Sequence, residues 1–475
     1  MKNIAQKIPF FLILIIVSFL YLNLGRDALF NWDEGIYAEL GRSLLIGEGS
    51  LLTPSWNGEI WLEKPPLISW VTALGISIFG VNELGARSLM PLFAGLTLFF
   101  VYKIGQFFAG PRLGIVAMSL LASFDLFLAR SRAVNTDGML LSALTFTLYM
   151  ALSKSSAFVI AFGIFFAVMS KGLAGLLVLG LILPLLFKRG LVFVARVAIF
   201  TVSLLLPWHL YQYLVNGSSF YTPYILEQVI RRATVPIEFH LESRYYYFNF
   251  LKENLQGGVL YLLILSLALL IFENIRKIQK TSYLLYWFLL PLIIFTLAKT
   301  RLYWYILPIY PAIALIIGHL FVRFDKFKLE KAMLSVFIVG LYLQSLLIIS
   351  RSVEIKKTIA PIPDPVAIAK LARDYPDNSL YVLVPESERI AEAILPAEQR
   401  LSSSFRYGGA PNLVFYSQKP IIYHYNIDEW QKALSQNLGL TMLVKADLAH
   451  LPRGYVVEAI KNDYILAKGV KDALR

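Results

Sequence analysis

The sequence contains no cysteine and few charged residues for its length. The absence of cysteine in 475 residues excludes disulfide bonds and thiolate chemistry. Only 16% of the residues are charged, whereas 57% are hydrophobic and the mean hydropathy is +0.63. Soluble domains carry about a quarter of charged residues. The composition therefore excludes a soluble globular protein and indicates a polytopic membrane protein.

The sequence also lacks the basic-aromatic surface that nucleic-acid-binding proteins present. The formal net charge is +13, which by itself would favour an anionic partner. Most lysines and arginines, however, fall in short clusters between apolar runs, as is typical of cytoplasmic loops. We therefore expect no nucleic-acid partner. No internal repeat is evident along the chain.

Apolar runs in the first 350 residues predict about eleven transmembrane helices, because each span needs about 20 residues. The run 67–80 is the exception, since two prolines open it and Lys64 and Glu83 flank it. If this run lies flat at the interface, the later basic clusters all fall on the N-terminal side, as the positive-inside bias requires. We therefore expect 67–80 to be an interfacial helix. The expected spans are 8–25, 89–108, 113–128, 138–153, 156–170, 172–187, 191–207, 257–272, 283–298, 303–321 and 332–350.

This topology collects most remaining ionisable residues on the outer side of the membrane. Such residues at the ends of apolar helices are costly to keep there, so a functional role is the default expectation. The outer loops carry Asp33, Glu34, Glu63, Lys64, Arg130, Arg132, Asp137, Lys171, Glu227, Arg231, Arg232, Lys299 and Arg301.

The composition changes after Arg351. The stretch IAPIPDPVA is rich in proline and predicts a linker. Short strand-like runs then alternate with helical ones, which predicts a small α/β domain. An odd number of crossings, eleven, places this domain on the outer side of the membrane. The domain contains no catalytic signature. We therefore expect a membrane-embedded catalytic domain over 1–350 and a soluble extracytoplasmic α/β domain over 351–475.

Carboxylates among many cations at the depth of a lipid phosphate fit transfer of a sugar from a lipid-phosphate donor. The phosphate is already a good leaving group, so the reaction needs one carboxylate base and fixed positive charge. A hydrolytic glycosidase would instead need two paired carboxylates. On the residues alone, a transporter or lipid flippase and a non-catalytic assembly protein remain open. Transporters usually show paired repeats and charges near the midplane, and this sequence shows neither.

Several motifs resemble those of a known family. They are WDEGIYAELGR, TPSWNG, LEKPPL, RAVNTDG, MSKGLAG and KTRLYWYILPIYPA. In this order, over roughly residues 8 to 350, they resemble the GT-C glycosyltransferases. The resemblance is to the bacterial branch shared by lipid A aminoarabinose transferase and protein O-mannosyltransferase-like enzymes. It implies a polyprenyl-phosphate sugar donor, inversion at the sugar, and an acceptor hydroxyl on lipid A, glycan or protein. It also implies a site on the outer face of the cytoplasmic (inner) membrane.

The resemblance implies roles for individual residues. Asp33 matches the catalytic base and Asp137 the second outer-loop acid, while Glu63 matches an acid that holds a divalent metal. Lys64, Arg231 and Tyr305 match contacts to the donor phosphate, and Tyr37 matches a substrate-binding tyrosine of the active site. The sequence departs from the family pattern at Ile36 and Gln228, where an arginine and a histidine are usual. These departures weaken the case for aminoarabinose and for a bound metal.

Four further residues of the outer loops are included in the expected site because of their position and chemistry. Glu34 is a catalytic candidate beside Asp33 and Asp137, Lys171 and Arg301 are substrate-binding candidates, and His240 is a candidate metal ligand. Structural roles remain open for most of the site. They are helix capping by Asp33 and Asp137, ion pairs of Glu34 with Arg42 and Glu63 with Lys64, snorkelling by Lys171 and Arg301, and a surface histidine at His240.

Overall fold

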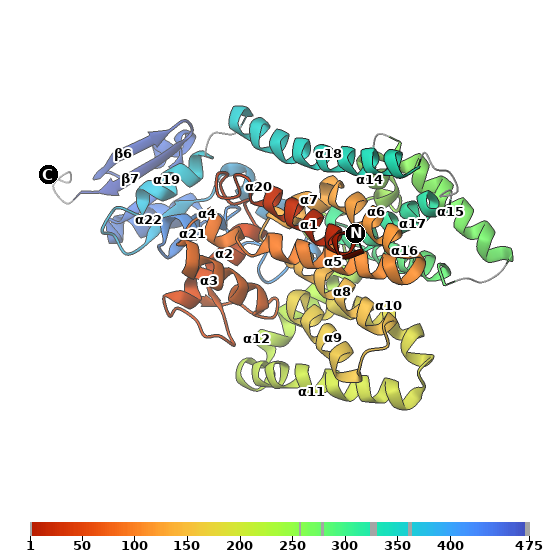
Figure 1. Ribbon diagram of the computed structural model, residues 1–475. Helices are drawn as coiled ribbons and strands as arrows, with labels where there is room; N and C mark the ends of the chain where they lie inside the picture. The colour runs from red at the N-terminus through yellow and green to blue at the C-terminus, as the bar shows by residue number, and fades with distance from the viewer. Residues whose placement is uncertain (1, 256–257, 277–279, 324–329, 360–362, 471–475) are drawn as a thin grey trace.

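The computed structural model describes residues 2–255, 258–276, 280–323, 330–359 and 363–470. Parts of the two basic loops expected in the cytoplasm, 273–282 and 322–331, and part of the expected linker lie outside these ranges. Figure 1 shows a body of helices with the C-terminal sheet at one end. The main helices of the body are α1 (Lys2–Tyr21), α5 (Met90–Ala109), α6 (Pro111–Ala122), α7 (Asp125–Arg132), α8 (Thr136–Leu152), α9 (Ala157–Lys171), α10 (Leu177–Phe187), α11 (Leu191–Asn216), α15 (Val259–Arg276), α16 (Ser282–Leu297), α17 (Tyr310–Arg323) and α18 (Glu330–Ile359).

Within the described ranges, four helical segments are long and apolar enough to cross a membrane, and six if two bent pairs each count as one span. The four segments are Glu83–Ala109, Ala157–Phe187, Leu191–Asn216 and Tyr303–Arg323. Shorter apolar helices occupy other expected spans, including Lys7–Tyr21, Thr136–Leu152, Ser282–Leu297 and Val336–Ser350. The helical polytopic fold is confirmed, whereas the count of about eleven crossings stays a prediction.

The segment Ala157–Phe187 reverses direction at a 3-10 turn, η1 (Gly172–Leu176). Arg189 Nη1 donates to the carbonyl oxygen of Ser155 at 2.7 Å, although 34 residues separate them. A straight helix of that length would hold them about 50 Å apart. Helices α9 and α10 therefore run antiparallel as two separate helices, at the positions of the predicted runs 156–170 and 172–187. A Cβ on Gly175 would lie 2.4 Å from the Ala167 backbone, so the close return requires glycine.

Helix α3 (Leu67–Phe79) does not cross the body. Its 13 residues span about 20 Å, whereas the hydrocarbon core is about 30 Å thick. Both flanks bond to the C-terminal domain: Tyr407 donates to Glu63 at 2.7 Å and Lys370 donates to Glu83 at 2.9 Å. The two ends of α3 therefore lie on the same side, in agreement with the expected interfacial helix.

The C-terminal domain contains a mixed five-stranded sheet of order β4-β3-β5-β7-β6. Strand β3 runs parallel to β4 and β5, whereas β7 runs antiparallel to β5 and β6. The runs expected as strands or helices all form such elements, which confirms the α/β prediction. Strand β4 and the helices α20 and α21 were not predicted. The elements are α19 (Asp364–Ala372), β3 (Leu380–Leu383), α20 (Glu386–Ile394), α21 (Asn412–Ser417), β4 (Ile421–His424), α22 (Ile427–Asn437), β5 (Leu440–Val444), β6 (Tyr455–Lys461) and β7 (Tyr464–Gly469).

The C-terminal domain shares a hydrophobic core with the first outer loop. Buried side chains of that loop, such as Tyr37 and Trp61, pack in one cluster with Leu413 and Phe415 of the domain. Figure 1 shows α2 (Asp33–Leu45) beside α21. Helix α18 continues to Ile359, beyond the composition change at Arg351. The domain therefore packs directly on the first outer loop.

We expect a reporter fused after Gly110 to be cytoplasmic and one fused to the C-terminal domain to lie outside. The apolar segment Glu83–Ala109 has 27 residues, about 40 Å of helix, and Glu83 at its start bonds to Lys370 of the domain. Gly110 therefore lies at the far end. Paired phosphatase and fluorescent-protein fusions measure the sidedness. Both reporters on one side would contradict this topology.

Candidate active site

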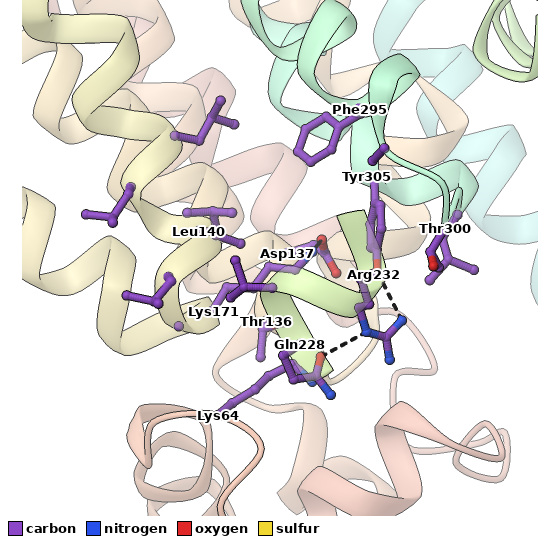
Figure 2. Close-up of a pocket in the computed structure, with 18 of the residues that line it drawn as sticks. Lys64, Thr136, Asp137, Leu140, Lys171, Gln228, Arg232, Phe295, Thr300 and Tyr305 are labelled. Atoms are coloured by element: carbon purple, nitrogen blue, oxygen red, sulfur yellow. Dashed lines mark hydrogen bonds and ion pairs between the residues drawn. The ribbon is translucent and has the colours of Figure 1, made fainter. Parts of the chain in front are cut away.

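Seven of the eleven expected site residues line a cavity of about 420 Å³ at the outer end of the helical body, which we call the inner cavity. Its apolar wall comes from α8, η1, α10, α16 and η3 (Tyr303–Ile309) and includes Leu140, Leu173, Leu177, Ile294, Phe295 and Pro308. Its polar end is formed by Asp33, Tyr37, Glu63, Lys64, Asp137, Lys171, Arg232 and Tyr305. Figure 2 shows several of these residues around one hollow.

A second cavity of about 560 Å³, the outer cavity, lies between the outer loops and the C-terminal domain. The domain contributes residues from Glu388 to Tyr407, and the loops contribute Trp32, Arg130 and His240. The two cavities share five polar lining residues, so they meet at that point. The shared polar residues are Asp33, Tyr37, Glu63, Lys64 and Arg232, and Leu302 and Trp304 also line both cavities.

Asp33 is the first residue of α2 and faces both cavities. The N-cap of this helix is Trp32, with φ 70°, and no side chain caps it, so Asp33 does not serve as the cap. The side chain of Asp33 is 42% exposed, and its recorded ion-pair partner is Arg130 at 3.8 Å. This carboxylate is therefore accessible and loosely held, as a general base requires.

The neighbouring Glu34 is buried, and both of its oxygens are engaged. Arg87 donates to them at 2.9 and 2.6 Å, and the backbone N–H groups of Phe30 and Val134 donate at 2.8 Å each. The alternative pair with Arg42 is wrong, because Arg42 binds Glu39 at 2.7 Å. Glu34 therefore ties α2 to α4 (Glu83–Arg87) and is a poor candidate for direct catalysis.

Asp137 also holds two cations. Lys171 and Arg130 both pair with its buried carboxylate, Arg130 at 2.9 Å. Asn135, not Asp137, caps α8 by accepting from Gly138 at 2.8 Å. The Lys171 ammonium lies 4.8 Å from the centre of the Tyr305 ring. Asp137 thus orients positive charge toward the inner cavity (Figure 2).

Lys64 lies between the two cavities over aromatic rings. Its ammonium is 5.6 Å from the ring centre of Tyr37 and 5.7 Å from that of Trp61. Burial lowers the pKa of Lys64, although the carboxylates of Glu63 and Asp33 oppose this effect. A desolvated ammonium gains strongly from an anionic ligand, which favours phosphate binding here.

The structure corrects two of the expected substrate contacts. Arg231 points away from the inner cavity, toward the C-terminal domain, and donates to the Glu398 carbonyl oxygen at 2.6 Å. Arg232 takes its place, with Nε donating to Gln228 at 3.1 Å and Nη1 to Tyr305 at 3.4 Å (Figure 2). The segment η2 (Thr222–Arg231) is a π-helix, and its wider turn changes which residue faces inward.

Arg301 is the second correction. Its guanidinium donates to the carbonyl oxygen of Thr296 at 2.9 and 3.3 Å and also to that of Glu242. The described cavities include its neighbours Thr300 and Leu302 but not Arg301 itself. This arginine therefore fastens two outer loops together instead of binding substrate.

Known proteins share parts of this sequence and nearly all of the fold. Residues 63–210 match the family described as dolichyl-phosphate-mannose-protein mannosyltransferase. ArnT from Cupriavidus metallidurans, solved bound to undecaprenyl phosphate, superposes with a TM-score of 0.75 over 98% of each chain, at 16% identity. The chain therefore shares the fold of this ArnT. The Archaeoglobus fulgidus oligosaccharyltransferase, solved with Zn and sulfate, gives a TM-score of 0.57 at 13% identity over 92% of this chain and 68% of its own.

Two proteins resemble this chain in sequence over most of its length. An uncharacterized protein of Aquifex aeolicus is 29% identical over 370 residues, which cover 74% of this chain and 72% of that protein. An undecaprenyl phosphate-alpha-4-amino-4-deoxy-L-arabinose arabinosyl transferase of Pseudomonas fluorescens is 28% identical over 66% of this chain. The match spans 57% of the length of that transferase.

The surroundings of Glu63 and His240 do not fit the expected metal site. Glu63 accepts from Tyr407 at 2.7 Å and from the Gln228 amide nitrogen at 3.0 Å. Both partners are neutral donors, and an amide nitrogen does not ligate a metal. His240 lines only the outer cavity, and burial and Arg232 lower its pKa. In the described parts of the chain, no three His, Asp or Glu side chains form a metal-binding group.

Three residues of the site were not predicted from the sequence. Arg232 was noted as an outer cation but not assigned to the site, although it follows Gln228 and Tyr224 at successive spacings of four. Arg87 and Tyr407 carried no local signal, since they meet Glu34 and Glu63 across 53 and 344 residues. Their contacts depend on the tertiary fold.

Proposed function

We propose that this protein is an inverting glycosyltransferase that moves a sugar from a polyprenyl phosphate to an acceptor hydroxyl. One observation carries the proposal. The accessible carboxylate of Asp33 lies where an apolar cavity with a cationic end meets a second, polar and aromatic cavity. A lipid-phosphate donor and a separate acceptor would need such a junction, with a base between them.

The inner cavity suits the donor. Its apolar wall would receive the isoprenoid next to the phosphate. Lys64, Lys171 and Arg232 at its polar end supply charge-assisted hydrogen bonds for the phosphate, and the Tyr305 hydroxyl adds another donor. The undecaprenyl phosphate bound by the structurally similar ArnT supports this class of donor.

The outer cavity suits the acceptor, whose hydroxyl oxygen would attack the anomeric carbon of the sugar. Asp33 accepts the hydroxyl proton as the new carbon–oxygen bond forms. The bond from the anomeric carbon to the phosphate oxygen breaks, and polyprenyl phosphate leaves with the bonding electrons. The cations stabilise the charge that develops on the phosphate, so no acid has to protonate it. A single displacement inverts the anomeric configuration.

The acceptor is an envelope lipid, glycan or protein on the outer face of the cytoplasmic membrane. This placement rests on the positive-inside bias and on a site that lies at the same end as the C-terminal domain. Mass spectrometry of envelope glycolipids and glycoproteins from a deletion strain and its complemented parent tests the proposal. We expect one sugar modification to disappear and to return on complementation. An unchanged envelope would contradict the proposal.

Replacing Arg232 with alanine should weaken donor binding far more than replacing Arg231. A charge-assisted bond to phosphate contributes about 1.5–3 kcal/mol, so Arg232→Ala should lower donor affinity about tenfold or more. Arg231→Ala is the matched control, because its guanidinium binds the Glu398 carbonyl oxygen outside the inner cavity. Binding of a polyprenyl-phosphate sugar to each purified variant measures the difference. Equal losses of donor affinity in the two variants would contradict the assignment of Arg232 to the phosphate site.

A further inference from the structure

A chain of hydrogen bonds links the C-terminal domain to the polar end of the inner cavity. It begins at Tyr407, whose hydroxyl accepts from Trp61 Nε1 at 2.8 Å and donates to Glu63 Oε1 at 2.7 Å. Glu63 Oε2 then accepts from Gln228 Nε2 at 3.0 Å. The side chain of Tyr407 is almost fully buried. A residue of the C-terminal domain thus bonds directly to Glu63 of the first outer loop.

The series of hydrogen bonds continues to Arg232, which lines the inner cavity. Gln228 Oε1 accepts from Arg232 Nε at 3.1 Å, and Arg232 Nη1 donates to the Tyr305 hydroxyl at 3.4 Å (Figure 2). An amide has a donor end and an acceptor end, so fixing one end fixes the other. Because Glu63 accepts from the nitrogen of Gln228, the oxygen of Gln228 must face Arg232.

We propose that Tyr407 is a positioning residue for Arg232, acting through Glu63 and Gln228. The inference rests on the proposed function, in which Arg232 binds the donor phosphate. By holding Glu63, Tyr407 sets the orientation of the Gln228 amide and thereby the direction of the guanidinium. The packing of the C-terminal domain against the outer loop is therefore coupled to donor binding.

The hydroxyl of Tyr407 serves this purpose separately from its ring. The ring packs edge-on against Trp56 and Trp32, with centroids 4.8 and 6.1 Å away. Phenylalanine would keep these contacts and remove only the bonds to Trp61 and Glu63. The released carboxylate of Glu63 would then be free to pair with the adjacent Lys64. Gln228 would lose its fixed orientation, and Arg232 would lose its support.

The matched control is Tyr416, a second tyrosine of the same domain. Its hydroxyl accepts from the Leu29 backbone N–H at 2.6 Å and donates to Glu83 at 3.1 Å. It therefore bonds to the outer loop as Tyr407 does, but it lines neither of the cavities described above. Tyr416→Phe reports the effect of losing an interface hydroxyl without disturbing the chain to Arg232.

The test is binding of undecaprenyl phosphate to the purified full-length protein. Tyr407→Phe should weaken binding about tenfold, and Tyr416→Phe should leave it unchanged. The double variant Tyr407→Phe/Gln228→Leu should bind no more weakly than Gln228→Leu alone, because both changes break one chain. With a sugar donor, Tyr407→Phe should raise the KM for the donor while kcat changes little.

The outcomes separate this inference from the proposed function. A wild-type protein that does not bind undecaprenyl phosphate would overturn the proposed function itself. Normal binding in the wild type with less than a twofold loss in Tyr407→Phe would overturn the positioning role. Equal losses in Tyr407→Phe and Tyr416→Phe, or additive losses in the double variant, would also overturn it.

Discussion

Asp33→Asn should lower turnover by about 10²–10⁴-fold while leaving donor affinity unchanged, because general-base catalysis contributes that much. Asparagine is nearly the same size but does not accept the acceptor proton as a base. The substitution should also leave the fold intact. The carboxylate of Asp33 is 42% exposed, and its ion-pair partner Arg130 keeps the closer bond to Asp137 at 2.9 Å.

The measurement is turnover of purified enzyme with a polyprenyl-phosphate sugar, alongside donor affinity and thermal stability. Unchanged affinity and stability would show that the loss arises in the chemical step. Near-normal turnover by correctly inserted Asp33→Asn protein would mean that another group accepts the proton.

Glu34→Ala should be the most destabilising of the substitutions considered. It would leave the Arg87 guanidinium, whose side chain is 5% exposed, as an unpaired charge. Breaking a buried ion pair in this way costs about 3–5 kcal/mol. Arg87 also holds the carbonyl oxygens of Leu24, Asp27 and Ala28, so the connection between α1 and α2 would loosen. Thermal or denaturant unfolding in detergent measures the loss.

Glu59→Ala is the matched control, since Glu59 is also an outer-loop glutamate paired with one arginine. Its partner is Arg406 at 3.1 Å, but the Glu59 side chain is 74% exposed. Exposed pairs contribute about 0–1 kcal/mol, so this variant should unfold almost like the wild type. A Glu34→Ala protein as stable as Glu59→Ala would contradict the structural role of Glu34.

The same ion pair predicts a pH dependence of stability. Burial alone would raise the pKa of Glu34, but Arg87 and the Phe30 and Val134 N–H groups outweigh it and lower the pKa. A lowered folded-state pKa means that Glu34 stabilises the fold fully above its unfolded pKa, about 4.3. This contribution is lost as the pH falls through the folded value. Glu34→Gln should therefore lose less stability than the wild type on acidification. Parallel pH profiles of the two proteins would exclude this linkage.

The sequence predicted the parts of the fold that depend on local patterns. Apolar runs marked the membrane helices, and the position of the basic clusters required the run 67–80 to lie flat, as α3 does. The sequence motifs also contained residues that line the polar end of the inner cavity. Asp33, Lys64, Asp137 and Tyr305 all line it. Each lies in a short motif at a helix end or in a loop, where neighbouring residues already define the environment.

Other features depend on contacts that local patterns do not encode. The π-helix η2 directs Arg232, not Arg231, into the inner cavity. The position and charge of Arg301 predicted substrate binding, but its guanidinium instead donates to the nearby carbonyl oxygens of Thr296 and Glu242. Tyr407 reaches Glu63 across 344 residues, because the C-terminal domain packs directly on the outer loop.

The anomeric configuration of the product tests the central claim most directly. If Asp33 activates the acceptor for a single displacement at the junction of the two cavities, the enzyme forms no covalent bond to the sugar. The product made by purified enzyme from a polyprenyl-phosphate sugar of known configuration should then be inverted, with one polyprenyl phosphate released per sugar transferred. NMR of the glycosidic linkage reads the configuration. A retained configuration would require a covalent intermediate or a different attacking group, and would contradict the assignment of Asp33 as the base.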